Sequence, residues 1–147
     1  MSQTKLAFVA SQDETALQAK SELENKYPHV PENQADVVIV LGGDGKMLEA
    51  LRYYIDKPVK VFGMNKGTVG FLMNEFSSDN LLKRIEAATL VTLHPLRMHV
   101  ETSTGIVKEA LAFNEVSLLR ETSQTAKLRI TIDGTVRMEE LLCDGIL

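Results

Sequence analysis

The sequence predicts an α/β protein with a parallel sheet in its N-terminal part and antiparallel β-structure in its C-terminal part. Short apolar runs alternate with amphipathic segments through the first 93 residues, and such a β-α-β order is typical of a parallel sheet covered by helices. From residue 94 onward, apolar residues recur with a period of two instead. We therefore predict an α/β domain at residues 1–93 and the start of an all-β domain at residues 94–147.

The first strand and helix are expected within residues 6–27. The apolar run Leu6–Ala10 predicts a buried strand. The carboxylate of Asp13 can cap a helix that follows it, and Pro28 ends that helix because proline cannot continue it. Four side chains fall three or four positions apart on the inner face of this helix: Ala16, Ala19, Leu23 and Tyr27.

Two further strand–helix pairs follow and make the first domain Rossmann-like. The run Val37–Leu41 is continuously apolar, as in a strand covered on both faces. Lys60–Phe62 predicts the third strand, and Ser78 or Asp79 is expected to cap the third helix. The inner faces are expected to carry Met47, Leu48, Leu51 and Tyr54 in the second helix, and Leu81, Leu82, Ile85 and Ala88 in the third.

The second domain is predicted to consist of antiparallel strands joined by tight turns. Apolar and polar residues alternate from Leu96 to Thr102 and again from Leu128 to Ile132. Asp133-Gly134 then gives a strong hairpin signal. The chain ends on apolar residues at Leu147, so we expect a fragment of a longer protein with an incomplete second domain.

Composition narrows the class of protein. The net charge of −4 argues against nonspecific binding of nucleic acid. Cys143 is the only cysteine, which excludes a disulfide framework within the chain and fits a reducing compartment. No apolar run is long enough for a membrane span. We expect a cytoplasmic protein whose partners are neither nucleic acid nor membrane.

The first candidate site is the glycine segment, residues 42–45, which reads Gly-Gly-Asp-Gly directly after the second strand. Glycines let a ligand approach the backbone closely, and N–H groups at a helix start attract phosphate oxygens. In one interpretation, Asp44 carries a divalent cation or accepts a proton beside bound phosphate. In the other, Asp44 bonds its own backbone in a tight turn. The residues alone leave both interpretations open.

A second glycine-rich segment, residues 63–70, leaves the end of the third strand. Ligands of parallel sheets bind in the crevice outside the carboxyl ends of the strands, so the two segments are expected to share one crevice. Asn65 offers a donor and an acceptor, which suits a ribose hydroxyl or a base edge. Phe71 either lies against an adenine ring or fills the core.

Four motifs follow one another along the chain. They read Leu-Gly-Gly-Asp-Gly at 41–45, Gly-x-Asn-x-Gly-x-x-Gly-Phe-Leu at 63–72, Phe-Asn-Glu at 113–115 and Cys-Asp-Gly at 143–145. Together they resemble the bacterial NAD kinase (ATP-NAD kinase) family over the chain from Leu6 to Leu147. The first motif is shared with diacylglycerol, sphingosine and 6-phosphofructo kinases, whereas the four together are specific. Lys46 departs from the family, which commonly has Thr or Ser there.

The resemblance implies ATP-dependent phosphorylation of the 2′-hydroxyl of NAD's adenosine ribose, giving NADP, with Mg²⁺ as cofactor. Gly42, Gly43 and Gly45 would hold ATP phosphates. Asp44 would be the catalytic carboxylate, acting as a general base or through a metal ion. Family members assemble as homodimers or homotetramers. The residues expected to bind NAD are Asp44, Gly45, Asn65, Phe71, Asn114, Glu115 and Asp144.

Two alternatives stay open at this point. One is a lipid kinase of the Gly-Gly-Asp-Gly group, acting on a diacylglycerol-like or sphingosine-like substrate. Kinases of that group are expected to have a second loop of the Gly-x-Gly-Asn-Asp type, which this sequence lacks. The other is a nucleotide-binding module without catalysis, suggested by the expected truncation.

Overall fold

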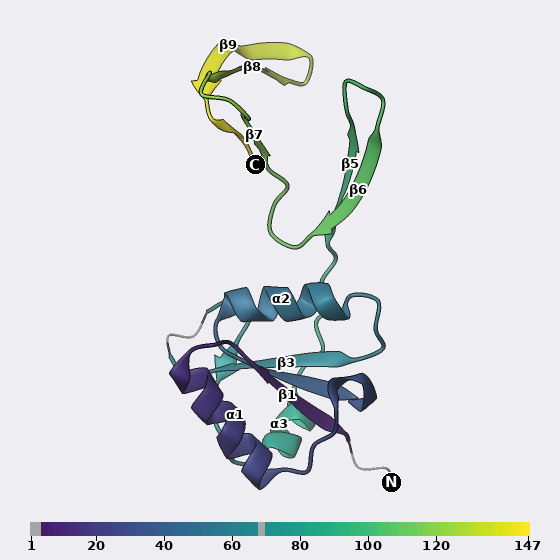
Figure 1. Cartoon of the computed structure of the whole chain (residues 1–147), viewed down its shortest axis with the longest axis vertical. Helices are drawn as coiled ribbons and strands as arrows, with labels where there is room; N and C mark the ends of the chain where they lie inside the picture. The colour runs from purple at the N-terminus through teal and green to yellow at the C-terminus, as the bar shows by residue number, and fades with distance from the viewer. Residues whose placement is uncertain (1–3, 68–69) are drawn as a thin grey trace. The chain divides into compact units, whose positions relative to one another are not determined.

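The computed structural model of the chain describes residues 4–67 and 70–147. The chain divides into two compact units, residues 1–92 (unit 1) and residues 93–147 (unit 2). Figure 1 shows the helices in unit 1 and the long hairpins in unit 2. The predicted α/β class, with a parallel sheet followed by antiparallel strands, is confirmed.

Unit 1 is built around a four-stranded parallel sheet with the strand order β1-β2-β3-β4. The central strand β2 pairs with β1 on one side and with β3 on the other, and all five of its residues are buried. The predicted first and second strands are confirmed with their bounds. The four strands are β1 (Leu6–Ala10), β2 (Val37–Leu41), β3 (Lys60–Asn65) and β4 (Asn74–Glu75).

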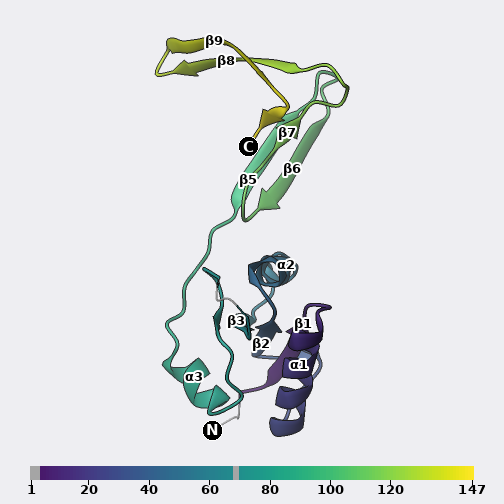
Figure 2. The same cartoon turned by 90° about the vertical axis from the view of Figure 1, so that its left-hand side faces the viewer.

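Helices cover both faces of this sheet (Figures 1 and 2). Helices α1 (Glu14–Lys26) and α3 (Leu81–Ala87) pack on one face, and α2 (Asp44–Tyr54) packs on the other. Side chains of a strand alternate between faces, so β2 serves both layers. Val37, Ile39 and Leu41 contact the α1 side, while Val38 and Val40 contact the α2 side. A short 3₁₀ helix, Glu32–Gln34, precedes β2.

The predicted helix starts have different outcomes. Asp13 caps α1 as predicted, because its Oδ1 accepts a hydrogen bond from the Ala16 N–H at 2.9 Å. The predicted cap of α3 by Ser78 or Asp79 is wrong, since the helix begins after Asn80, which has a φ of 52° and makes no side-chain cap. Asp79 instead pairs through its carboxylate with the Lys26 amine.

The third strand is longer than predicted and takes residues from the second glycine-rich segment. β3 continues through Asn65, so Gly63 lies inside a strand. A Cβ on Gly63 would lie 2.6 Å from the Met73 sulfur, so this glycine makes room for core packing. What remains is a loop from residue 66 to residue 73, named the β3–β4 loop, of which residues 68 and 69 lie outside the described residues.

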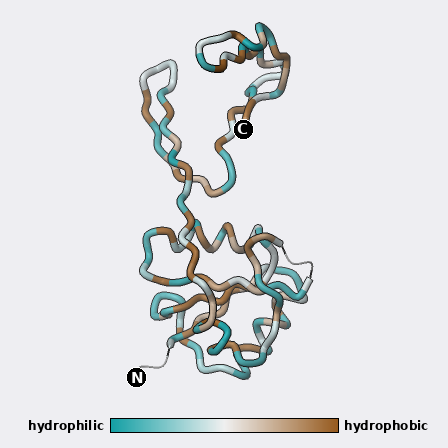
Figure 3. The backbone as a smooth tube through the Cα atoms, turned by 180° about the vertical axis from the view of Figure 1, so that it is seen from behind, coloured by the Kyte–Doolittle hydropathy of each residue, from teal (hydrophilic) through white to brown (hydrophobic). Residues whose placement is uncertain are grey.

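Unit 2 consists of antiparallel strand pairs, as predicted. Asp133 and Gly134 both have positive φ, 48° and 76°, which is the geometry of the expected tight hairpin turn. Hydrophobic and hydrophilic residues alternate along the hairpins of unit 2 (Figure 3). The pairs are β5 (Leu96–Glu101) with β6 (Val107–Ala112), β7 (Leu118–Leu119) with β10 (Gly145–Ile146), and β8 (Ala126–Ile132) with β9 (Thr135–Cys143).

The two units differ in the burial of their apolar side chains. Every buried apolar residue in the described part of the chain belongs to unit 1. In unit 2, large apolar side chains such as Leu118 and Ile146 remain at least half exposed. Among the described residues, no helix is long and apolar enough to cross a membrane.

Candidate functional site

The glycine segment lies where β2 ends and α2 begins. Gly42 has a φ of +145°, a conformation that L side chains rarely adopt. A Cβ at this position would also lie 2.6 Å from the Ser11 Oγ. The Gly42 N–H donates to the Met64 carbonyl at 3.2 Å, which ties the segment to β3. Gly42 is therefore required by the protein's own packing and backbone geometry.

Gly43 and Gly45 face open space instead. A Cβ added to either residue would meet no heavy atom within 4 Å, and both residues are exposed. Helix α2 starts at Asp44, so the N–H groups of Asp44 and Gly45 have no acceptor within the helix. The helix dipole adds a partial positive charge at this end. A phosphate group can therefore approach the start of α2 without steric obstruction from side chains at these two positions.

The Asp44 carboxylate binds the β3–β4 loop. Its Oδ2 accepts the Phe71 N–H at 2.9 Å, and its Oδ1 accepts the Leu72 N–H at 3.1 Å. These donors lie 27 and 28 positions further along the chain, so Asp44 joins two loops rather than bonding its own turn. Each carboxylate oxygen accepts one of these hydrogen bonds and keeps further acceptor capacity for a proton or a metal ion.

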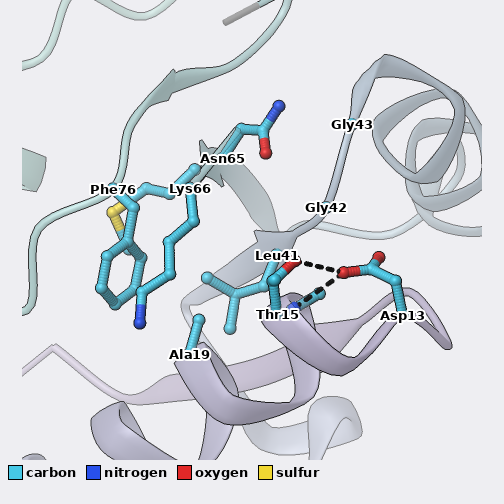
Figure 4. Close-up of a pocket in the computed structure, with 11 residues that line it drawn as sticks. Asp13, Thr15, Ala19, Leu41, Gly42, Gly43, Asn65, Lys66 and Phe76 are labelled. Atoms are coloured by element: carbon cyan, nitrogen blue, oxygen red, sulfur yellow. Dashed lines mark hydrogen bonds between the residues drawn. The ribbon is translucent and has the colours of Figure 1, made fainter. Parts of the chain in front are cut away.

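A pocket of about 210 Å³ opens beside the glycine segment, at the carboxyl ends of β2 and β3 (Figure 4). Asn65 and Lys66 approach it from the β3 side, and helix α1 forms the opposite wall. Asp44 is not among the described residues that line it. The lining residues are Asp13, Thr15, Ala16, Ala19, Leu41, Gly42, Gly43, Met64, Asn65, Lys66 and Phe76.

Two charged side chains line the pocket, Lys66 on one wall and Asp13 on the other, and the sequence motifs assigned neither of them to a ligand site. The Lys66 amine lies 3.2 Å from the Glu22 carboxylate and 4.5 Å from the centre of the Phe76 ring. Hydrogen bonds from the Ser78 hydroxyl and then from Lys66 lower the pKa of Glu22. On the other wall, hydrogen bonds from Ser11, Thr15 and the Ala16 backbone lower the pKa of Asp13 to about 2.

The motif residues of the second segment have distinct positions. Asn65 lines the pocket, and its Oδ1 accepts the Gly67 N–H at 2.9 Å. Phe71 is fully exposed, so of its two predicted alternatives the one in which its ring fills the core is wrong. The Lys46 amine lies 2.9 Å from the Glu49 carboxylate on the same helix, so it is paired with a neighbour one turn away.

The remaining predicted residues belong to unit 2. Asn114 and Glu115 follow β6 and are exposed. Asp144 forms an ion pair with Arg120, whose Nε lies 2.7 Å from its Oδ1. Gly145 has a φ of +158°, and a Cβ on it would lie 1.9 Å from the Leu118 carbonyl oxygen. The Asp144-Gly145 pair therefore lies at the point where β10 joins β7.

The comparison with protein families identifies the chain. The sequence profile of the ATP-NAD kinase N-terminal domain matches residues 1–91. The chain belongs to the ATP-NAD kinase family. The match covers the whole parallel sheet and the glycine segment of this family member.

Several curated relatives carry the name NAD kinase. A protein of Hyphomonas neptunium is 52% identical over 147 residues, which is 100% of this chain and 58% of that relative. A protein of Caulobacter vibrioides is 52% identical over 144 residues, 98% of this chain and 55% of the relative. A protein of Brucella suis is 50% identical over 149 residues, 100% of this chain and 58% of the relative. The chain thus spans less than two thirds of the length of these relatives.

Among the described residues, no group of three or more His, Cys, Asp or Glu side chains is arranged to hold a metal ion. Kinases commonly hold Mg²⁺ through one or two carboxylates together with the substrate's phosphates. Asp44 is a carboxylate at the start of α2 with remaining acceptor capacity, so it fits the part of a single protein ligand for such an ion.

Proposed function

We propose that the complete protein is an NAD kinase, which transfers the γ-phosphoryl group of ATP to the 2′-hydroxyl of NAD's adenosine ribose and releases NADP. Membership of the ATP-NAD kinase family and the named relatives support this proposal. The structural observation that carries it is the Asp44 carboxylate, held by the β3–β4 loop next to glycines that face open space.

The glycine segment takes the donor's phosphates in this proposal. Gly43 and Gly45 leave room at the start of α2, where N–H groups and the helix dipole attract anionic oxygens. Gly42 ties the segment to β3 through the hydrogen bond from its N–H to the Met64 carbonyl. Mg²⁺, when bound together with ATP, would reduce the negative charge of the phosphates, and Asp44 would be its protein ligand.

Asp44 accepts the proton of the attacking hydroxyl. The ribose 2′-oxygen forms a bond to the γ-phosphorus, and the bond from that phosphorus to the β–γ bridging oxygen breaks. The hydroxyl proton passes to the Asp44 carboxylate, and ADP leaves. Catalysis of this kind relies mainly on positioning and charge balance. The two backbone hydrogen bonds to the Asp44 carboxylate provide the positioning.

NAD is bound by the residues that follow Asp44 in the motifs. The exposed ring of Phe71 suits stacking against adenine, and Asn65 suits a ribose hydroxyl or a base edge. In unit 2, Asn114 and Glu115 are exposed and offer amide and carboxylate groups to the adenosine portion. Asp144, oriented by Arg120, contributes a carboxylate to the dinucleotide site.

The proposal also covers the setting in which the protein works. We place it in the cytoplasm as a homodimer or homotetramer. The resemblance of its four motifs to bacterial NAD kinases and the single cysteine in the chain support these assignments.

Formation of NADP tests the proposal. The full-length protein is incubated with NAD, ATP and Mg²⁺, and an NADP-specific dehydrogenase reports the product. We expect NADP formation that depends on both ATP and NAD. Phosphate transfer to diacylglycerol or sphingosine without transfer to NAD would instead identify a lipid kinase. Binding of NAD and ATP by calorimetry, without any turnover, would identify a nucleotide-binding module and overturn the proposal.

A further inference from the structure

We propose that Gly70 is a positioning residue for Asp44: the missing side chain at residue 70 lets the next two backbone N–H groups hold the carboxylate at the start of α2. This inference rests on the proposed function, because it assigns Gly70 a part in the work of Asp44. The residue itself touches neither of the reacting groups in this assignment.

The space beside Gly70 is already filled by the carboxylate. A Cβ added to Gly70 would lie 2.3 Å from the Asp44 Oδ2 and 2.4 Å from both its Cγ and its Oδ1. Real Cβ atoms essentially never approach heavy atoms this closely. The requirement for glycine at residue 70 is therefore at least one of space.

Neither partner can move away without losing the contact between the loops. Asp44 is the first residue of α2, and both of its oxygens are bound by the adjacent N–H groups of Phe71 and Leu72. The loop side is anchored as well, since Leu72 packs partly buried against the core on the α2 face and Met73 is buried there. A side chain at residue 70 therefore displaces the carboxylate or separates it from its donors.

The same loop provides a matched control. Gly67 has an ordinary φ, and a Cβ on it would meet only the Asn65 Oδ1, at 3.5 Å, which is normal van der Waals contact. Gly67→Ala and Gly70→Ala are thus the same chemical change in one loop, with and without a collision with Asp44. A difference in kcat between the two variants therefore arises from the displaced Asp44 carboxylate and not from a general change in the flexibility of the loop.

Kinetics of the full-length protein provide the first test. Because a misplacement of about 1 Å at a catalytic group costs roughly 100-fold in rate, Gly70→Ala is expected to lower kcat by about that factor. The KM for NAD is expected to stay within about threefold, since proton transfer to Asp44 acts mainly in the transition state. Gly67→Ala is expected to keep kcat within about twofold, as its added methyl group meets no catalytic residue. Equal kcat values for the two variants would overturn the inference.

A double-mutant cycle separates positioning from a structural role. In an Asp44→Asn background the catalytic carboxylate is already lost, so adding Gly70→Ala should change the residual kcat by less than about twofold. A further loss as large as in the wild-type background would show that Gly70 acts independently of Asp44, and would refute the assignment.

Amide hydrogen exchange gives a readout that does not depend on activity. Asp44→Ala and Gly70→Ala should each accelerate exchange at the Phe71 and Leu72 N–H groups, while Gly67→Ala should leave it unchanged. If the wild-type protein makes no NADP but shows this exchange pattern, the proposed function fails and the coupling of Gly70 to the carboxylate stands. Unchanged exchange in Gly70→Ala would overturn the inference even in an active NAD kinase.

Discussion

The two segments at the carboxyl ends of β2 and β3 both contain glycines, but the glycines meet different surroundings. Gly42 is crowded by Ser11, and Gly70 by Asp44. Gly43 and Gly45 face open space, where a ligand can approach. A glycine in a loop can thus be required either by the protein's own neighbours or by a ligand, and only the positions of nearby atoms distinguish these cases.

Removal of the group that joins the two segments should have the largest effect. Asp44→Asn keeps the size of the side chain and one acceptor oxygen, but it cannot accept the hydroxyl proton. Because loss of a general base typically costs about 10²- to 10⁴-fold, we expect kcat for NADP formation to fall within that range. Because the amide NH2 cannot accept from one of the two loop N–H groups, a stability loss of about 1–3 kcal/mol is expected, and retained cooperative thermal unfolding is the control for an intact fold. A kcat close to that of the wild type would refute the assigned role of Asp44.

Substitution of the crowded glycine in the first segment should lower stability. Gly42→Ala puts a Cβ at a φ of +145° and 2.6 Å from the Ser11 Oγ. Strain of this kind costs about 1–3 kcal/mol, so the free energy of unfolding in urea should fall by that amount. Gly43→Ser is the matched control: its side chain enters open space at a helix N-cap, and a change of less than about 0.5 kcal/mol is expected. Equal stability of the two variants would contradict the distinction.

Substitution of an uncrowded glycine should raise the stability of the protein and weaken its use of ATP. Gly45 lies in the first turn of α2, where alanine is a better helix former by up to about 1 kcal/mol. We expect Gly45→Ala to raise the free energy of unfolding slightly and to raise the KM for ATP, because the methyl group occupies space proposed for phosphate. Measured together, urea unfolding and initial rates against ATP concentration test this. An unchanged KM for ATP would remove Gly45 from the phosphate site.

The smallest expected effect concerns the pocket wall opposite β3. The pKa of Asp13 is about 2 in the folded protein, below its usual value of 3.8. A depressed carboxyl pKa adds stability above the unfolded-state value, and this stability is lost as the pH falls toward the folded-state value. Asp13→Asn keeps a capping oxygen for α1 and should flatten the decline of the urea midpoint between about pH 4 and pH 2. An identical decline of the urea midpoint in the wild type and in Asp13→Asn would contradict a lowered pKa of Asp13.

The local elements were predictable because they depend on neighbouring residues. Continuous apolar runs identified β1 and β2, and Asp133-Gly134 identified a hairpin turn. The two-residue strand β4 is too short to show a periodic pattern. The cap of α3 was predicted incorrectly because the Asp79 carboxylate binds Lys26 from a distant helix, an interaction that no local pattern reveals.

The sequence by itself determined the order of the three longer strands and three helices of unit 1, the position of the glycine segment and the motifs that indicate the family. Apolar periodicity and glycine spacing are properties of adjacent residues and need no tertiary contact to be read. Only the tertiary structure decided that Asp44 accepts hydrogen bonds from residues 27 and 28 positions away, and that Gly70 must lack a side chain. Those contacts exist because β2 and β3 pair in parallel and bring the loops at their carboxyl ends together.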